Sequence, residues 1–230
     1  MISIIIPAYK SVKFIDECVK SINIPGVEIL IGVDCCIETY NHIKHLDGVF
    51  YFAKNVGPYV IKNTLIDIAS NEDIIFFDAD DIMVTERILD IKEALQKSDY
   101  VKLNYLNFRE ISGEDDWHTD VIMDNNAVIA IKKNLFNSLN GFYPWKCGAD
   151  SEFAYRLEYN KLKQGPIHDL CYYRRIHGEN LTLREETCYG SALRNEYIKI
   201  IDMHTKADNW PNPQIKTKEE YYAKNRNAKK

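Results

Sequence analysis

Residues 73–81 read DIIFFDADD, and this stretch decides the class of fold. It begins with a short apolar run, which is typical of a strand buried on both faces of a sheet. Three carboxylates follow within four positions, at Asp78, Asp80 and Asp81. Carboxylates this close repel one another unless a cation lies among them, and their hard oxygen atoms suit Mg²⁺ or Mn²⁺. The alternatives are acids that form a turn or cap a helix, and the same cluster would also serve a nucleotidyltransferase or a phosphatase.

Three further apolar runs precede this strand, at residues 2–6, 28–33 and 48–53. Between the runs, apolar residues recur at helical spacing in residues 14–22 and 60–69. Short apolar strands separated by amphipathic helices predict an α/β fold, with a mostly parallel sheet covered by helices on both faces.

The carboxyl ends of these strands carry a distinctive set of residues: Pro7, Ala8 and Tyr9, then Asp34, and then residues 78–81. In open sheets of this kind, ligands bind beyond the carboxyl ends of the strands. We therefore expect a binding site where these three segments meet.

The second half of the chain mixes strands with one clear helix. Alternation and apolar runs predict strands at residues 100–108, 127–131 and 170–174, and helical spacing predicts a helix at 149–159.

The composition describes a globular chain. Of its 230 residues 46% are hydrophobic, which is enough to bury one core. No apolar run reaches the roughly 18 residues of a membrane-spanning helix, and the first residues lack the basic prelude and cleavage site of a secretory signal. Six cysteines occur without zinc-ligand spacing, which predicts free thiols. We expect a cytoplasmic protein with no membrane span.

The charge is distributed unevenly. The formal net charge is −5, yet residues 206–230 carry seven basic and three acidic side chains. An acidic core argues against broad binding of a phosphate backbone, so nucleic acid is not favoured as a partner, although the tail alone could contact one.

A series of short motifs follows in order along residues 1–185. They read SIIIPAYKSVKFIDECVKSI, VDCC, NVGPYVIKN, FFDADD, GFYPWKCGADSEFAYRL and YYRRIHGENLT. Their order resembles that of the family 2 glycosyltransferases. The chain departs from the family at VDCC, where the usual motif is Val-Asp-Asp-Gly-Ser, and at Ala149, where the family has the Glu of a Glu-Asp pair.

The resemblance implies a GT-A fold and an inverting, metal-assisted transfer of a sugar from a nucleotide-diphosphate donor to an acceptor hydroxyl. UDP-sugars are the commonest donors of such enzymes, and glycans are their usual acceptors. We expect a single GT-A domain over residues 1–205, with a nucleotide-binding half at 1–100 and an acceptor half at 101–205, followed by a polar, basic tail at 206–230.

Other functions remain as alternatives. These are the same chemistry on a hydroxylated base in DNA, a nucleotidyltransferase, and an inactive sugar-binding module. The loop PAYKSVKF contains no glycine, which argues against the triphosphate-binding loop of a nucleotidyltransferase. An inactive module would have lost Asp80 or Asp150, and both are present.

Carried over by position, the resemblance implies that seven residues bind the nucleotide-sugar: Pro7, Ala8, Tyr9, Asp34, Lys62, Asp78 and Ala79. Within this set, Asp34 would accept a hydrogen bond from the base and Asp78 would contact the ribose. Lys62 stands where the family often has Arg, and it keeps the charge but loses the planar fork.

The resemblance also implies the residues that carry the chemistry. Asp80 and His177 would hold Mn²⁺ or Mg²⁺, and Asp150 would be the base that takes the proton of the acceptor hydroxyl. Glu152, which lies close to Asp150 in the sequence, is the alternative base. Arg174 and its neighbour Arg175 are candidates for contacts with the diphosphate.

The same residues have ordinary structural roles as alternatives. Asp34 would be an acid in a turn at the end of a strand, and Lys62 an exposed cation on a helix. A lone histidine such as His177 is most often structural or exposed. Asp150 or Ser151 would cap the helix that follows.

Overall fold

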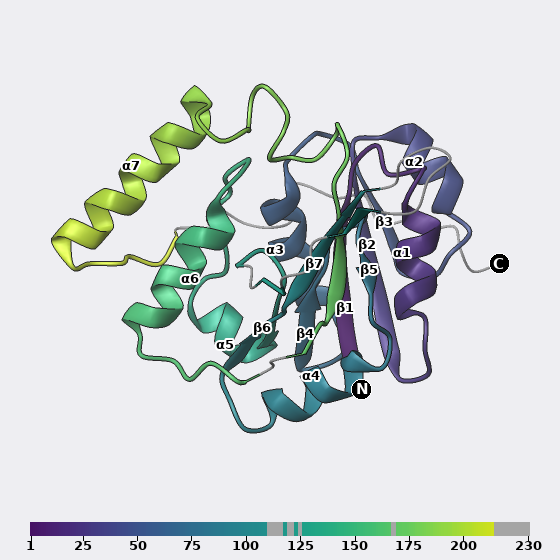
Figure 1. The fold of residues 1–230 in the computed structure, drawn as a ribbon, viewed down its shortest axis with the longest axis horizontal. Coiled ribbons are helices and arrows are strands. Elements are labelled where there is room, and N and C mark those ends of the chain that lie inside the picture. The colour runs from purple at the N-terminus through teal and green to yellow at the C-terminus, as the bar shows by residue number, and fades with distance from the viewer. Residues whose placement is uncertain (110–116, 119–121, 124–125, 167–168, 214–230) are drawn as a thin grey trace.

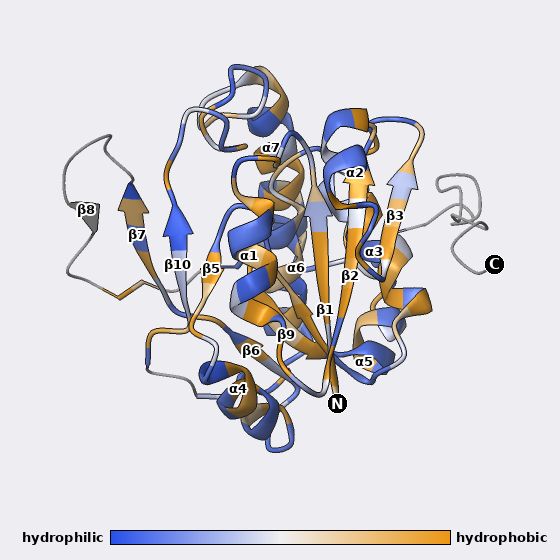
Figure 2. Ribbon diagram, turned by 90° about the vertical axis from the view of Figure 1, so that its right-hand side faces the viewer, coloured by the Kyte–Doolittle hydropathy of each residue, from blue (hydrophilic) through white to orange (hydrophobic). Residues whose placement is uncertain are grey.

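The computed structural model describes residues 1–109, 117–118, 122–123, 126–166 and 169–213. These residues form an α/β fold in which a six-stranded sheet lies between two layers of helices, with a smaller sheet beside it (Figure 1, Figure 2). The predicted fold class is therefore confirmed.

The central sheet has the strand order β3-β2-β1-β4-β9-β6. Its first four strands run parallel. β9 is antiparallel to β4, and β6 at the edge is antiparallel to β9, so β6 runs in the same direction as the first four strands. The strands are β1 (Ile2–Ala8), β2 (Val27–Asp34), β3 (Val49–Phe52), β4 (Asp73–Phe76), β6 (Tyr100–Lys102) and β9 (Ile129–Lys132).

Alternation along β1 divides the core into two parts. Ile4 and Ile6 pack into the cluster on one face of the sheet, and Ile5 packs into the cluster on the other, because successive side chains of a strand point to opposite faces. The first face is covered by α1 (Ile15–Ile22), α2 (Ile37–Ile43) and α4 (Arg87–Leu95). The second face is covered by α3 (Pro58–Ile68), α5 (Lys133–Ser138), α6 (Ala149–Tyr159) and α7 (Ala192–Ala207).

The smaller sheet has the order β5-β10-β7-β8. Its strands are β5 (Ile82–Met83), β10 (Tyr172–Arg175), β7 (Tyr105–Arg109) and β8 (Trp117–His118). The alternating stretch predicted at 100–108 is thus two strands in two sheets. In the smaller sheet β10 pairs with β5, and β5 directly follows the acidic cluster at 78–81.

The end of the described chain differs from the expected tail. The boundary predicted at residue 206 falls inside α7, which continues to Ala207. Beyond it, Trp210 is only 9% exposed, and its ring stacks on Tyr155 of α6 with centroids 5.2 Å apart. Burial of this indole ring stabilises the fold, although the segment around it is polar in composition. Residues 214–230 of the predicted tail lie outside the described residues.

Within the described parts of the chain, no helix combines the length and the apolarity that are needed to cross a membrane.

Candidate active site

A pocket of about 900 Å³ opens beyond the carboxyl ends of β1, β2 and β4. It brings together the following residues singled out from the sequence: Pro7, Ala8, Tyr9, Asp34, Lys62, Asp78, Ala79, Asp80 and Asp150. His177 is not part of the lining, but it contacts Asp80 at the rim.

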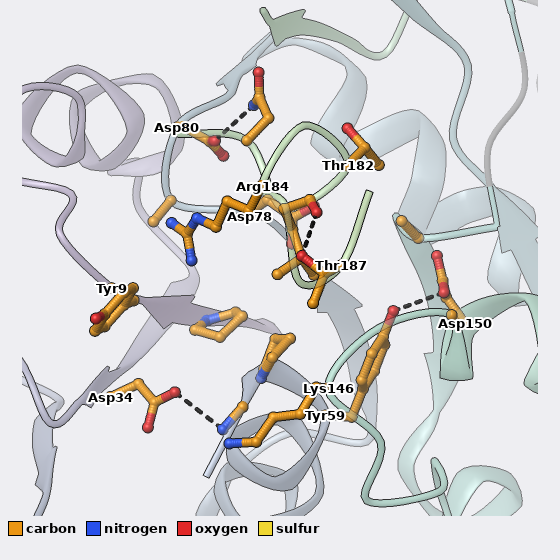
Figure 3. A pocket seen from close by; sticks show the side chains of 18 of the residues that line it. Tyr9, Asp34, Tyr59, Asp78, Asp80, Lys146, Asp150, Thr182, Arg184 and Thr187 are labelled. Carbon is orange, nitrogen blue, oxygen red and sulfur yellow. Dashed lines mark hydrogen bonds between the residues drawn. The ribbon is translucent and has the colours of Figure 1, made fainter. Parts of the chain in front are cut away.

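The acidic residues are spread across this pocket in order (Figure 3). Tyr9 and Asp34 lie on one side, Asp150 lies on the other, and Asp78 lies between them. The parallel strands explain the order of Asp34, Tyr9 and Asp78, since β2, β1 and β4 are neighbours and end at the same edge of the sheet. Asp150 comes from α6.

Asp34, the last residue of β2, is 4% exposed and holds the loop before α3. Its two oxygens accept the backbone N–H groups of Val56 and Gly57, at 2.7 and 2.9 Å. Burial raises the pKa of Asp34, and the two hydrogen bonds oppose this effect because they favour the charged form. Each carboxylate oxygen can accept more than one hydrogen bond, so the loop contacts leave acceptor capacity.

Lys62 is buried at 2% exposure, which excludes its reading as an exposed helical cation. Its Nζ lies 3.2 Å from Oδ1 of Asp78. Burial raises the pKa of Asp78, Lys62 lowers it in part, and the nearby charge of Asp80 raises it again. The two residues therefore form an ion pair in the wall of the pocket.

Asp80 is contacted from the end of β10. Its Oδ2 lies 2.8 Å from Nε2 of His177 and 3.2 Å from Nδ2 of Asn180. On the other side of the ring, Nδ1 of His177 accepts the backbone N–H of Glu179 at 3.2 Å. With Nδ1 as an acceptor, Nε2 carries a proton, and this N–H donates a hydrogen bond to Asp80. A cation could bind Nε2 only after this proton leaves and the contact with Glu179 changes.

Asp81 also lines the pocket, and it is bound to the backbone of β10. It is 3% exposed, and its Oδ1 accepts the backbone N–H of Arg175 at 2.9 Å. Burial and the charges of Asp80 and Asp78 raise its pKa well above the usual value. Arg175 itself is 2% exposed and pairs with Glu17 at 2.5 Å, so of the two neighbouring arginines it is Arg174 that lines the pocket.

The donor atoms near Asp80 fit a divalent cation that is bound together with a phosphate ligand. Among the described residues, no group of three or more His, Cys, Asp or Glu side chains is arranged to hold a metal. Mg²⁺ needs no such cage, because it is usually bound by one or two carboxylates, phosphate oxygens and water. Asp80 and His177 place a carboxylate oxygen and a ring nitrogen side by side, as two neighbouring ligands of one ion would lie.

Asp150 is the second residue of α6 and does not cap it. The N-cap is Gly148, at φ 76°, and no side chain makes a capping hydrogen bond there. Instead, Oδ1 of Asp150 accepts a hydrogen bond of 2.6 Å from the hydroxyl of Tyr59. Both capping alternatives, Asp150 and Ser151, are therefore excluded.

Glu152, the alternative base, is fully buried and does not line the pocket. Its carboxylate accepts hydrogen bonds of 2.6 and 2.9 Å from Nε and Nη2 of Arg156. The same guanidinium donates to the carbonyl oxygens of Leu139 and Gly141, each at 2.6 Å. This pair joins α6 to the segment that follows α5.

Several pocket residues received no role from the sequence: Tyr59 and Lys146 lie inside the quoted motifs, and Arg184 and Arg194 lie beyond them. All four line the pocket. The guanidinium of Arg184 lies 5.2 Å from the centre of the Tyr9 ring, and its buried Nε has no hydrogen-bond partner among the described residues. The motifs give no signal for Arg184, because it lies beyond them and only the fold brings it into the pocket.

The strand order and the helices on both faces of the sheet are those of a GT-A fold. The sequence profile described as "Glycosyl transferase family 2" matches residues 3–163. The chain therefore belongs to glycosyltransferase family 2. No curated protein sequence matches it significantly.

Solved structures share the fold at low sequence identity. TarS 1-349 of S. aureus in complex with UDP-GlcNAc matches with 18% identity and a TM-score of 0.64, over 88% of this chain and 65% of that chain. TarS 1-349 without a named ligand matches with 18% identity and a TM-score of 0.60, over 76% and 60%. The mannosyltransferase PcManGT of Pyrobaculum calidifontis, in complex with GDP-Man and Mn²⁺, matches with 14% identity and a TM-score of 0.57, over 78% and 58%. The chain spans less than two thirds of the length of each of these structures.

Proposed function

We propose that this protein is an inverting glycosyltransferase that moves a sugar from a nucleotide-diphosphate donor to an acceptor hydroxyl with the help of Mn²⁺ or Mg²⁺. One observation carries the proposal: Asp34 and Asp150 lie on opposite sides of one pocket, with Asp78 between them. Such a pocket has room for a nucleoside at one end, a diphosphate in the middle and an attacking hydroxyl at the other. We further propose that residues 1–205 are one catalytic domain.

A uridine donor is the first candidate. The TarS structures were solved with UDP-GlcNAc and with UDP, which supports a nucleotide-sugar in the corresponding pocket of this chain. Tyr9 would stack on the base, and Asp34 would accept a hydrogen bond from it. The mannosyltransferase PcManGT was solved with GDP-Man, so the identity of the nucleotide base is what most needs a test.

The reaction is a single displacement. Asp150 takes the proton of the acceptor hydroxyl, and the oxygen attacks the anomeric carbon from the face opposite the diphosphate. The new C–O bond forms as the bond to the diphosphate oxygen breaks, and the nucleoside diphosphate leaves with the electron pair. One such displacement inverts the anomeric centre.

A divalent cation would be held by Asp80, with His177 as a further ligand once its contact with Glu179 changes. When bound, it would neutralise the charge that develops on the leaving diphosphate. The buried Nε of Arg184 is a further donor available to a phosphate oxygen in this part of the pocket.

The test is a screen of nucleotide-sugars for hydrolysis, with and without Mn²⁺, combined with thermal shifts by UDP, GDP, ADP and CDP. A ligand that binds the folded state alone at about 100 times its Kd stabilises it by about 2.7 kcal/mol. We expect the largest shift from UDP. Equal shifts from all four nucleotides would count against base recognition by Asp34, and no turnover of any nucleotide-sugar would contradict the proposed activity.

A further inference from the structure

We propose that Tyr59 is a positioning residue that orients the carboxylate of Asp150 for proton removal. The hydroxyl of Tyr59 donates a hydrogen bond of 2.6 Å to Oδ1 of Asp150 across the pocket wall (Figure 3). This inference rests on the proposed role of Asp150 as the base.

Tyr59 itself is held firmly and stays protonated. It is 5% exposed, and its ring packs on Phe142 with centroids 5.4 Å apart. Burial, and then the charge of Asp150, raise the pKa of Tyr59 well above its usual value. The phenol therefore stays neutral over the working pH range, and its O–H group donates a hydrogen bond to the carboxylate.

The carboxylate needs such a partner. The last torsion of an aspartate side chain is broad, so helix geometry alone does not fix the plane of the carboxylate. The bond from Tyr59 engages Oδ1 and leaves Oδ2 for the proton of the acceptor hydroxyl. A fixed plane matters because proton transfer requires the base within hydrogen-bond reach of the proton that it takes.

The position of Tyr59 comes from the opposite side of the pocket. Asp34 holds the N–H groups of Val56 and Gly57 just before α3, and Pro58 opens the helix at the position where its fixed φ suits it. Tyr59 is the next residue. Asp34 at the end of β2 therefore holds the segment 56–59 in place, and Tyr59 of this segment orients Asp150 on α6.

Other charged or titratable groups surround Asp150 from each neighbouring element. Asp78 lies at the end of β4, and its pKa is raised in part by the charge of Asp150. Cys147 precedes α6, and Lys62 of α3 is paired with Asp78. Arg194 of α7 donates to the carbonyl oxygen of Thr187 at 2.8 Å. Lys62 and Arg194 donate hydrogen bonds to other partners, whereas Tyr59 donates its hydrogen bond to Asp150 itself.

The experiment compares Tyr59→Phe with Tyr100→Phe. Both variants remove one phenol hydroxyl from a buried tyrosine, but that of Tyr100 contacts Gln164 and lies outside the pocket lining. Hydrolysis of UDP-GlcNAc, in which water is the attacking hydroxyl, is measured from about pH 5 to 9, with UDP affinity and melting temperature alongside.

We expect kcat of Tyr59→Phe to fall about tenfold or more, because a carboxylate that is free to turn is less often within hydrogen-bond reach of the proton that it takes. The acid limb of the rate profile should move to higher pH, because a carboxylate that loses a hydrogen bond to its charged form is protonated more readily. UDP affinity and the profile of Tyr100→Phe should stay as in the wild type. An unchanged kcat and an unchanged profile in Tyr59→Phe would overturn the inference, since a purely structural bond moves neither.

Two further variants separate this inference from the proposed function. If Asp150→Asn keeps the wild-type rate, Asp150 is not the base and both proposals fall. If Asp150→Asn collapses the rate while Tyr59→Phe does not change it, only the role of Tyr59 falls. If both are right, Tyr59→Phe adds no further loss to Asp150→Asn, because contacting residues that act as a unit are not additive. A wild-type protein that turns over none of the nucleotide-sugars would overturn the proposed function and this inference with it.

Discussion

His177 and Asp80 are 97 positions apart in the chain, yet Nε2 of the histidine lies 2.8 Å from Oδ2 of the aspartate. The smaller sheet makes this contact. β10 pairs with β5, and the backbone N–H of Arg175 binds Asp81, so the segment after β10 is held against the acidic cluster. The ring of His177 also lies on Phe14, with centroids 4.4 Å apart, which limits its movement.

The contact between Asp80 and His177 leads to the first prediction, that the metal and the donor stabilise the protein jointly. With Mn²⁺ present, UDP should raise the melting temperature of the wild-type protein, and a strong chelator should remove most of that increase. In Asp80→Asn the increase should be the same with and without Mn²⁺, because the charged oxygen that would hold the cation is gone. Melting curves with and without UDP check this.

A matched control is available in the same cluster. Asp81→Asn changes a carboxylate whose Oδ1 is bound to the backbone of Arg175, so it should lower stability but keep the response to Mn²⁺. Turnover that persists at full rate in the chelator would show that the transfer needs no metal.

Arg184 leads to a second prediction. Its buried Nε lacks a partner among the described residues, which is a cost that a phosphate oxygen would relieve. Arg184→Met should therefore weaken binding of UDP by about tenfold or more, since hydrogen bonds to charged groups are worth about 1.5–3 kcal/mol. Binding of uridine, which has no phosphate, should change little. Equal losses for both ligands in calorimetric titrations would place Arg184 against the base instead.

The local parts of the fold could be predicted from the sequence. β1 and β4 are short apolar runs, and α6 shows helical spacing from Ala149 to Tyr159, the bounds that the structure also has. Periodicity is sufficient here because burial on a sheet or on a helix face imposes it directly. The acids at the strand ends could also be placed in one pocket, because neighbouring parallel strands end at the same edge of the sheet.

Contacts between distant segments could not be predicted in this way. β5 has two residues, too few for any period, and it becomes a strand only because β10 lies beside it. Tyr59 reads as an ordinary core aromatic at the start of a helix, and its partner Asp150 is 91 positions away. Trp210 follows a helix that the sequence did not predict, so its stacking on Tyr155 was not foreseen.

The docking of Trp210 leads to a third prediction. Trp210→Ala should lower the free energy of unfolding by about 2 kcal/mol or more, because it exposes apolar surface of Tyr155 and removes a stacked ring. A protein that ends at Pro213 keeps this contact and should unfold at nearly the temperature of the full chain. One that ends at Ala207 should resemble Trp210→Ala. Thermal melts of the four proteins decide this, and equal stability of all four would show that the contact contributes nothing.

The last prediction compares two acids of the first turns of α6. Asp150→Asn keeps an oxygen that can accept the hydrogen bond from Tyr59, and the residue caps no helix, so the fold should be affected by less than about 1 kcal/mol. Its transfer rate should fall about 100- to 10,000-fold, which corresponds to about 3–5 kcal/mol of transition-state stabilisation, while UDP affinity stays nearly constant.

Glu152→Gln should give the opposite result. It leaves the buried guanidinium of Arg156 without its counter-charge, which costs about 3 kcal/mol of stability or more. The folded fraction of that variant should still turn over at close to the wild-type rate, because Glu152 does not line the pocket. Rates per folded molecule, UDP affinities and melting temperatures of the two variants, measured side by side, make the comparison. A rate collapse in Glu152→Gln with full activity in Asp150→Asn would identify Glu152 as the base. Because Glu152 does not line the pocket, this result would contradict the proposed mechanism as a whole.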